Sequence, residues 1–297
     1  MFVSVIIPTH NRVSVLERAL SSVVAQTYSC LEVIVVDDGS TDRTSDMLSS
    51  KFPRIRLIGL GANQGAASAR NAGLRVANGD VIAFLDSDDE WHPTYLGKQL
   101  ASLRSFPDAA LSYSGLYHSY SNTYFRAALG KPLTADDWVK SLLIANFITT
   151  LSQVVIPRVM FEGAGMRFDD RLSICEDVEL YLRLCALGRP VCCKEYLVVK
   201  HWEQDSLLLT ERCEKWSREG FKMLEIFFNT DAGARYRSLR LIAESSLRRT
   251  VMSALHAYDR FHQAGELPAW GERIEAPWGR GECIGESSLI SNVGTEY

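Results

Sequence analysis

Four acidic residues directly follow a short apolar run in the first third of the chain. Residues 81–85 are all apolar, and Asp86, Asp88, Asp89 and Glu90 come next. Such a run predicts a strand buried on both faces, and open α/β sheets bind ligands at the carboxyl ends of their strands. Asp86 and Asp88 are two apart, so an extended backbone points both carboxylates to one side. A cation would offset their repulsion, and hard oxygen ligands favour Mg²⁺ or Mn²⁺ shared with substrate phosphates. An acidic turn that only caps the strand is the alternative.

Two earlier polar clusters also follow predicted strands. Residues 3–7 lead through Pro8 into a loop at residues 9–12, and residues 31–36 lead into the acidic stretch 37–42. Strands that alternate with helices at this spacing predict a mostly parallel sheet with right-handed crossovers. The three clusters would then meet at one edge of the sheet, while the loops of the opposite edge lack such residues. The sequence therefore predicts a ligand site at the carboxyl edge.

The other elements are predicted from apolar periodicity and from cap residues. Ser14 and Glu17 suggest a capping box at the start of the first helix. Further strands are expected at residues 55–60, 152–157 and 191–199, and further helices at about 42–50, 66–77, 91–106, 133–150 and 176–187. Gly59, Gly61 and Gly65 do not form a dinucleotide-binding fingerprint, because their spacing is wrong and they follow the third strand.

The composition bounds the classes of function. The 297 residues are 46% hydrophobic with a formal net charge of -4, which does not suggest binding to nucleic acid. Seven Cys without a CxxC pattern are typical of a reduced cytosolic chain and not of a disulfide framework or a zinc site. No basic-then-apolar leader is visible, and no apolar run approaches the roughly 20 residues of a membrane span. We expect a cytoplasmic protein.

Four sequence blocks together resemble a known family. They are residues 3–12, residues 33–42, the pattern Asn63-x-Gly65 with Ala69-Arg70-Asn71-x-Gly73, and residues 84–89. In this order and spacing the chain resembles the family 2 glycosyltransferases, and the likeness extends through Cys175-Glu176-Asp177 over about the first two thirds. The resemblance implies the α/β GT-A fold: a Rossmann-like, mixed, mostly parallel sheet flanked by helices. It also implies an inverting transferase that uses a nucleotide-diphosphate sugar and Mn²⁺ or Mg²⁺.

The resemblance also implies roles for individual residues. Asp88 would be the main metal ligand, Asp86 would reach the ribose or the metal, and His201 could be a further metal or diphosphate ligand. Asp38 would accept an N–H of the base, most naturally uracil, although guanine also offers one. The positions implied to contact the nucleotide-sugar are Pro8, Thr9, Asn11, Arg12, Asp38, Asn63, Gly65, Arg70, Asp86 and Ser87.

Glu176 and Asp177 open the predicted helix at residues 176–187. An acid in the first turn lies near the positive end of the helix dipole, so we expect a lowered pKa for Asp177. An inverting transfer needs a carboxylate to take the proton of the acceptor hydroxyl. Position alone favours a capping role, whereas the resemblance favours Asp177 as the base with Glu176 beside it. For His201, a hydrogen-bonded structural role is the alternative.

The chain divides by composition into three parts. Residues 1–206 are expected to form the GT-A domain, with a nucleotide-sugar half (1–105) and an acceptor half (106–206); 207–265 form a helical extension, and 266–297 a flexible tail. The aromatic stretch at 111–125 predicts either a sugar-stacking wall or, more simply, a pair of strands. A basic amphipathic helix at 234–261 would pack against the catalytic domain or a second subunit; peripheral binding to the inner face of the membrane is the alternative.

Three functions compete. The first is an inverting glycosyltransferase that moves a sugar, with a UDP-sugar favoured, to a hydroxyl of a glycan or lipid-linked acceptor in bacterial surface polysaccharide or glycan synthesis. A sugar nucleotidyltransferase would need a glycine-rich basic loop after the first strand, and residues 8–12 contain no glycine. An inactive nucleotide-sugar-binding scaffold would not need Asp86, Asp88 and Asp177 together. The first is therefore preferred.

Overall fold

The computed structural model describes residues 1–127, 129–133, 137–163, 165–202, 209–264, 272–274 and 277. Most of the predicted tail, 266–297, lies outside these residues. The strands are β1 (Val3–Thr9), β2 (Leu31–Asp37), β3 (Arg56–Gly59), β4 (Val81–Phe84), β5 (Asp89–Trp91), β6 (Ala109–Tyr120), β7 (Thr123–Arg126), β8 (Val154–Pro157), β9 (Arg189–Trp202) and β10 (Glu272–Ile274). The α-helices are α1 (Val13–Val24), α2 (Thr44–Lys51), α3 (Ala66–Val76), α4 (Tyr95–Ser105), α5 (Trp138–Ile144), α6 (Val159–Gly163), α7 (Glu176–Leu187), α8 (Leu209–Phe228), α9 (Asp231–Ala234) and α10 (Arg240–Ala264), and two 3-10 helices are η1 (Leu151–Gln153) and η3 (Arg237–Leu239).

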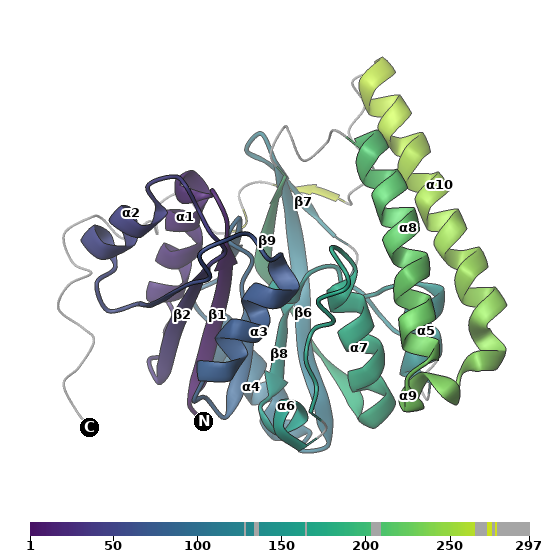
Figure 1. Ribbon diagram of the computed structural model, residues 1–297, viewed down its shortest axis with the longest axis horizontal. Helices are drawn as coiled ribbons and strands as arrows, with labels where there is room; N and C mark the ends of the chain where they lie inside the picture. Colours follow the sequence, from purple (N-terminus) through teal and green to yellow (C-terminus); the bar gives the residue numbers. More distant parts are fainter. Residues whose placement is uncertain are drawn as a thin grey trace.

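One mixed sheet with helices on its faces confirms the predicted fold class (Figure 1). The strand order is β10-β7-β6-β8-β4-β1-β2-β3, and β9 pairs with both β5 and β6. The pairs β1–β2, β1–β4 and β2–β3 are parallel, whereas β8 joins β4 antiparallel and the pairs β6–β7 and β6–β8 are also antiparallel. The parallel half is the predicted nucleotide-sugar half. Its strands all end at the same edge.

Several predicted boundaries shift for reasons of pairing. β1 continues through Pro8 to Thr9. Proline has no amide N–H to donate, but β4 pairs with β1 only as far as Ile6, so no hydrogen bond to β4 is lost at Pro8. β9 runs to Trp202 in register with the long β6, so His201 lies inside a strand. The predicted capping box is wrong: α1 starts at Val13, whose N–H donates to Asp42 Oδ2 at 3.1 Å. The carboxylate of one loop thus caps the helix of another.

Two apolar layers cover the sheet. Alternate residues of the central strands face opposite layers, as period 2 requires: Ile6 and Phe84 belong to one cluster, Val5 and Ala83 to the other. Gly73 on α3 lets this helix pack closely, since a Cβ there would lie 2.5 Å from Ile6 Cγ2. The stretch 111–125 forms the antiparallel pair of β6 and β7, which confirms the simpler of its two interpretations.

The C-terminal helices pack on the helices that cover the sheet. Figure 1 shows α8 and α10 side by side along α7 and α5. Phe227 and Phe228 of α8 are buried in the same cluster as Leu180 and Tyr181 of α7. The favoured expectation, packing, therefore holds for one side of the extension. Within the described residues, no helix combines the length and the apolar character that crossing a bilayer requires.

Candidate active site

The three polar clusters meet at the carboxyl edge of the parallel strands. The Asn11 N–H donates to Ser40 Oγ at 2.9 Å, and Asn11 Oδ1 accepts from Thr41 N at 2.7 Å. Asn11 adopts a positive φ of 51°, which this residue tolerates better than most. Arg12, from the same loop, donates to Asp88 Oδ2. The predicted convergence of the three loops is therefore confirmed.

Both oxygens of the Asp86 carboxylate accept hydrogen bonds from neighbouring side chains. Oδ1 accepts from Arg70 Nη2 at 2.7 Å and Oδ2 accepts from Thr150 Oγ1 at 3.0 Å, while the Asp86 N–H donates to Ser152 Oγ at 3.0 Å. Burial favours the neutral acid, but the attraction of Arg70 and Lys200 and the hydrogen bonds outweigh it and lower the pKa of Asp86. The side chain is thus a fixed carboxylate at neutral pH.

Asp88, like Asp86, is partly open to solvent. Its carboxylate is 25% exposed and pairs with Arg12, and its backbone carbonyl accepts from Arg18 Nη2 at 2.9 Å. Ser87, between the two acids, is buried. Asp89 turns inward, and Ser152 Oγ donates to it at 2.6 Å. Burial and the neighbouring Asp88 raise the pKa of Asp89 to about 8, so this acid serves the structure and not the ligand edge.

A divalent cation fits Asp86 and Asp88 better than it fits His201. Both carboxylates supply hard oxygens, and each oxygen accepts at most one hydrogen bond from the described residues, so lone pairs remain. His201 is 12% exposed and its Nε2 lies 3.3 Å from Glu90 Oε2. Among the described side chains, no three His, Cys, Asp or Glu are grouped as a ready-made metal cage. The donor set is therefore two carboxylates whose other positions would be filled by phosphate oxygens and water.

Asp38 holds a neighbouring loop. Its Oδ1 accepts from Gln64 N at 2.7 Å and its Oδ2 from Gly65 N at 2.8 Å. Asn63 Oδ1 also accepts from Gly65 N, at 3.1 Å, and Gly65 has a φ of 90° that favours glycine. Asp37 Oδ1 accepts from Ser40 N at 2.9 Å, so this carboxylate orients the loop that follows β2. Each oxygen of Asp38 keeps a lone pair for a further donor.

Polar atoms in this region lack partners among the described residues. Thr9 Oγ1, Arg70 Nε and Tyr181 Oη are buried and make no hydrogen bond there. Pro8 is half-buried beside Thr9 at the end of β1. Buried polar groups are normally satisfied, so such atoms favour a bound polar molecule or water in the site.

Arg70 joins the acidic loop to α7. Its guanidinium is buried; Nη2 contacts Asp86, and Nη1 donates to Glu176 Oε1 at 2.5 Å. The next residue, Asn71, donates to Phe168 O at 2.9 Å and accepts from Phe168 N at 3.0 Å. The motif Ala69-Arg70-Asn71-x-Gly73 therefore fixes α3, the acidic loop and the approach to α7 relative to one another.

Asp177 is half-buried in the first turn of α7, as predicted. Its Oδ1 accepts from Val178 N at 2.8 Å. Burial and the adjacent Glu176 raise the pKa of Asp177 to about 7, although Arg70 opposes them. The predicted lowering of this pKa is therefore wrong, because the helix dipole is weaker than burial beside a second acid. A carboxyl group with a pKa near neutrality suits a general base better than a permanently ionised one does.

Sequence reasoning missed the residues that approach from the acceptor half. Thr150 and Ser152 support Asp86 and Asp89, and Lys200 lies close enough to lower the pKa of Asp86. Thr150 is the N-cap of η1 and Ser152 lies within it. The capping-box pattern of Thr150 and Gln153 is the local signal that could have marked this turn. The only sequence signal for Lys200 is its position next to His201. In the structure, the pairing of β5 with β9 sets Lys200 opposite Asp89.

Comparison with known proteins defines the class. The profile described as Glycosyl transferase family 2 matches residues 4–168, so the chain belongs to this family. It is 38% identical over 190 residues to the UDP-Glc:alpha-D-GlcNAc-diphosphoundecaprenol beta-1,3-glucosyltransferase WfaP of Escherichia coli, which covers 63% of this chain and 71% of that protein. The share of a relative's own length that the chain covers differs widely, for example 27% in one curated relative and 80% in another.

Solved structures share the fold. S. aureus TarS 1-349 in complex with UDP superposes with a TM-score of 0.65 at 18% identity, covering 91% of this chain and 77% of that one. The mannosyltransferase PcManGT from Pyrobaculum calidifontis, in complex with GDP-Man and Mn2+, gives 0.61 at 20% identity, covering 90% and 76%. At these identities the likeness shows the GT-A fold alone.

Proposed function

We propose that this family 2 glycosyltransferase is an inverting, metal-dependent enzyme that transfers a sugar from a UDP-sugar to a hydroxyl of a lipid-linked glycan. The observation that carries the proposal is the link through Arg70, which contacts Asp86 at the ligand edge and Glu176 beside Asp177. A donor-side carboxylate and the acid next to Asp177 thus lie on either side of one buried guanidinium. This link would hold the donor site and the base in a fixed relation, as a direct displacement requires of its reacting groups.

Each residue has a role in this reaction. Asp86 and Asp88 would hold Mn²⁺ or Mg²⁺, which neutralises charge on the departing diphosphate. Arg12, released from Asp88, could turn to the phosphates. Asp177 would take the proton of the attacking hydroxyl, and Tyr181 lies close enough to Asp177 for the two to interact electrostatically. His201 would support Glu90 in preference to binding the metal.

The site and the relatives together support this choice of donor and acceptor. Asp38 retains lone pairs at the ligand edge, which supports recognition of an imide N–H and hence a uracil base. WfaP is named for UDP-Glc and for an acceptor on diphosphoundecaprenol, which supports a lipid-linked acceptor and a role in bacterial polysaccharide synthesis.

The outer side of α10 suits a lipid-linked acceptor. Leu247 and Val251 face inward, but Leu241, Ile242 and Met252 are exposed at 79%, 45% and 51%. Arg249 lies on the same exposed side, whereas the guanidinium of Arg248 lies over the Phe221 ring of α8. Exposed apolar side chains beside arginines favour peripheral contact with an anionic membrane surface, in the cytoplasm. A homodimer through this helix is the competing use.

The decisive experiment combines donor, metal and acceptor. The purified full chain should release UDP from a UDP-sugar when Mn²⁺ and GlcNAc-diphosphoundecaprenol, or a short-chain analogue, are present. GDP- and dTDP-sugars are the matched controls, and EDTA removes the metal. NMR of the product reports the anomeric configuration. Release of pyrophosphate from a sugar phosphate and UTP would instead support a sugar nucleotidyltransferase, and binding without turnover of any donor would support the scaffold.

A further inference from the structure

Asp177 follows a residue with a strained backbone. Cys175, the N-cap of α7, has φ 66° and ψ 10°, the left-handed region that residues other than Gly, Asn and Asp rarely adopt. Such a conformation persists only where surrounding contacts enforce it, and it is found mostly at functional sites. The two residues that Cys175 aims are Glu176 and Asp177. Whatever holds Cys175 therefore decides where the acids point.

The contacts that hold Cys175 come from the helical extension. The Ser173 N–H donates to Glu219 Oε2 of α8 at 3.0 Å, and the thiol of Cys175 contacts Trp216 of the same helix. Glu219 is only 6% exposed, although it carries a carboxylate. The hydrogen bond from Ser173 is the main reason that the pKa of Glu219 lies below its ordinary value. The Ser173 amide thus stabilises the ionised form of the buried Glu219 carboxyl group.

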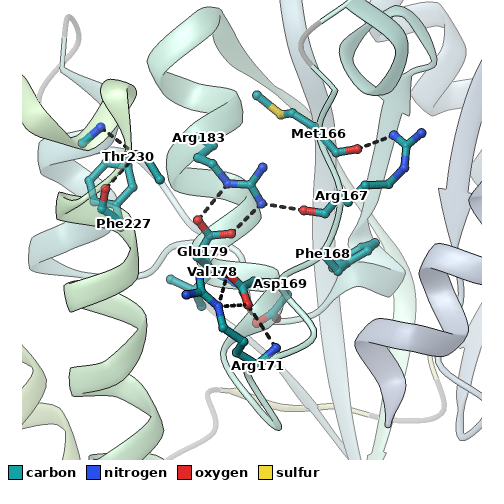
Figure 2. Close-up of polar contacts among 12 residues, drawn as sticks. Met166, Arg167, Phe168, Asp169, Arg171, Val178, Glu179, Arg183, Phe227 and Thr230 are labelled. Atoms are coloured by element: carbon teal, nitrogen blue, oxygen red, sulfur yellow. Dashed lines mark hydrogen bonds and ion pairs between the residues drawn. The ribbon is translucent and has the colours of Figure 1, made fainter. Parts of the chain in front are cut away.

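We define the base loop as residues 165–175, which precede α7. Its first half is fixed to the catalytic core, because Asn71 clamps Phe168 and Phe168 packs on Phe84 with ring centroids 5.2 Å apart. Figure 2 shows the start of the loop, where Arg183 donates to Arg167 O at 2.6 Å. The second half has its contacts with α8, including one from Lys222 Nζ to Arg171 O.

Packing anchors the base loop at Phe168 and Leu172, which are both buried in the core cluster. Beside Asp169 and Arg171 the loop borders an open pocket of about 820 Å³, which Ile226 of α8 also lines. Beyond Leu172, the hydrogen bond from the Ser173 N–H to Glu219 links the loop to α8. α8 itself is firmly anchored, since Leu224 and Phe227 are buried in the core cluster shared with α7. The helix can therefore act as a rigid support.

We propose that α8 is a positioning element of the active site, which acts through Glu219 and Trp216 to hold Cys175 and thereby aim Asp177. The inference rests on the proposed function, in which Asp177 is the base. It assigns to the extension a part in transfer and not only in docking. Glu219 does not touch substrate in this scheme; it is a positioning residue.

The test separates turnover from binding in the full chain. Glu219→Ala removes the acceptor for the Ser173 amide, and misplacement of the base should lower kcat about 10- to 100-fold. The KM for UDP-glucose and the calorimetric affinity for UDP should stay at the wild-type values, because the donor side is untouched. Glu219→Gln can still accept the amide and should restore most of kcat. Glu214→Ala, on an exposed position of the same helix, is the control.

A second readout does not need activity. Hydrogen–deuterium exchange of residues 173–177 should be faster in Glu219→Ala than in wild type, and unchanged in Glu214→Ala. Wild-type kcat with unchanged exchange in Glu219→Ala would overturn the proposal while leaving the transferase function intact. A wild-type chain that turns over no nucleotide-sugar would instead refute the proposed function, and the exchange data would still decide whether α8 holds the loop.

The strain at Cys175 gives an independent pair of variants. Cys175→Gly and Cys175→Ala both lose the contact with Trp216, but only glycine adopts a positive φ without steric cost. The glycine variant should therefore keep a higher kcat than the alanine variant. Equal or reversed values would mean that the left-handed conformation does not aim Asp177.

Discussion

Arg70 Nη1 lies 2.5 Å from Glu176 Oε1, so a buried ion pair ties α3 to the first turn of α7 across 106 residues of sequence. Asp86 completes the contact on the other side of the guanidinium. The resemblance to the family implied that Arg70 contacts the nucleotide-sugar. The structure adds that its side chain is committed to two carboxylates, which makes it a joint between the donor side and the base side.

Loss of this joint should cost stability as well as turnover. Arg70→Ala leaves buried Glu176 without its partner, and breaking a buried pair from one side costs about 3–5 kcal/mol. Arg70→Lys should fail to restore both contacts, because one ammonium cannot match the planar fork of a guanidinium. Thermal unfolding of the variants measures the cost, with the exposed Arg75→Ala of α3 as control. A melting temperature equal to wild type in Arg70→Ala would refute the joint.

Metal binding should compete with Arg12. Asp88→Ala removes a proposed ligand and should abolish the Mn²⁺-dependent part of UDP affinity, measured by calorimetry with and without EDTA. Arg12→Ala frees the Asp88 carboxylate, so it should strengthen binding of Mn²⁺ alone. His201→Ala should change neither, since its ring contacts Glu90. An unchanged, EDTA-insensitive UDP affinity in Asp88→Ala would exclude this metal site.

Asp38 can be tested for two roles at once. Asp38→Ala should weaken UDP binding by about 1–3 kcal/mol if its carboxylate accepts from the base. It also releases the amides of Gln64 and Gly65, which would weaken any ligand that needs this loop. Affinity for inorganic diphosphate distinguishes the two roles. An equal loss for diphosphate and UDP would assign Asp38 to the loop and not to the base.

Asp177 should give the enzyme a pH dependence. A base must be ionised to act, and its pKa is raised to about 7, so kcat/KM should rise with pH through about 7. Asp177→Asn should lower kcat about 10²–10⁴-fold and abolish this limb. UDP affinity should be retained, since the variant is nearly isosteric. Near-normal turnover in Asp177→Asn would redirect the search for the base to Glu176.

The raised pKa of Asp177 also predicts that the stability of the fold depends on pH. Because the folded chain raises the pKa of Asp177 above its ordinary 3.8, the proton is held more tightly in the folded state. The contribution of protonated Asp177 to the stability of the fold is fully present below the pKa of Asp177 in the unfolded chain. It is lost as the pH rises through about 7. Asp177→Asn should therefore melt at a higher temperature than wild type at pH 8, and the gap should close below about pH 4. A gap that does not depend on pH would contradict the raised pKa.

Membrane contact through α10 is testable with vesicles. Leu241→Gln and Arg249→Gln should each weaken sedimentation with phosphatidylglycerol vesicles, the latter by about 1 kcal/mol per arginine. Arg104→Gln, exposed on α4 in the nucleotide-sugar half, is the control. Loss of a dimer in size-exclusion chromatography, with vesicle binding unchanged, would assign the face to a second subunit.

The sequence alone determined the fold class, the carboxyl-edge location of the site and the position of Asp177 at a helix start. These features depend on local patterns: buried strands are apolar runs, and polar clusters stand directly after them. The convergence of residues 9–12, 37–42 and 86–90 then follows from the rules of parallel sheets.

The tertiary structure decided what the site residues contact. That Arg70 joins Asp86 to Glu176, that Thr150 and Ser152 support the acids, and that Glu219 reaches the base loop are contacts between distant segments with no local signal. The direction of the Asp177 pKa shift was decided in the same way. A helix end is visible in the sequence, but burial beside a second acid arises only when the chain packs. Burial destabilises the ionised carboxylate by more than the helix dipole stabilises it, so the pKa rises.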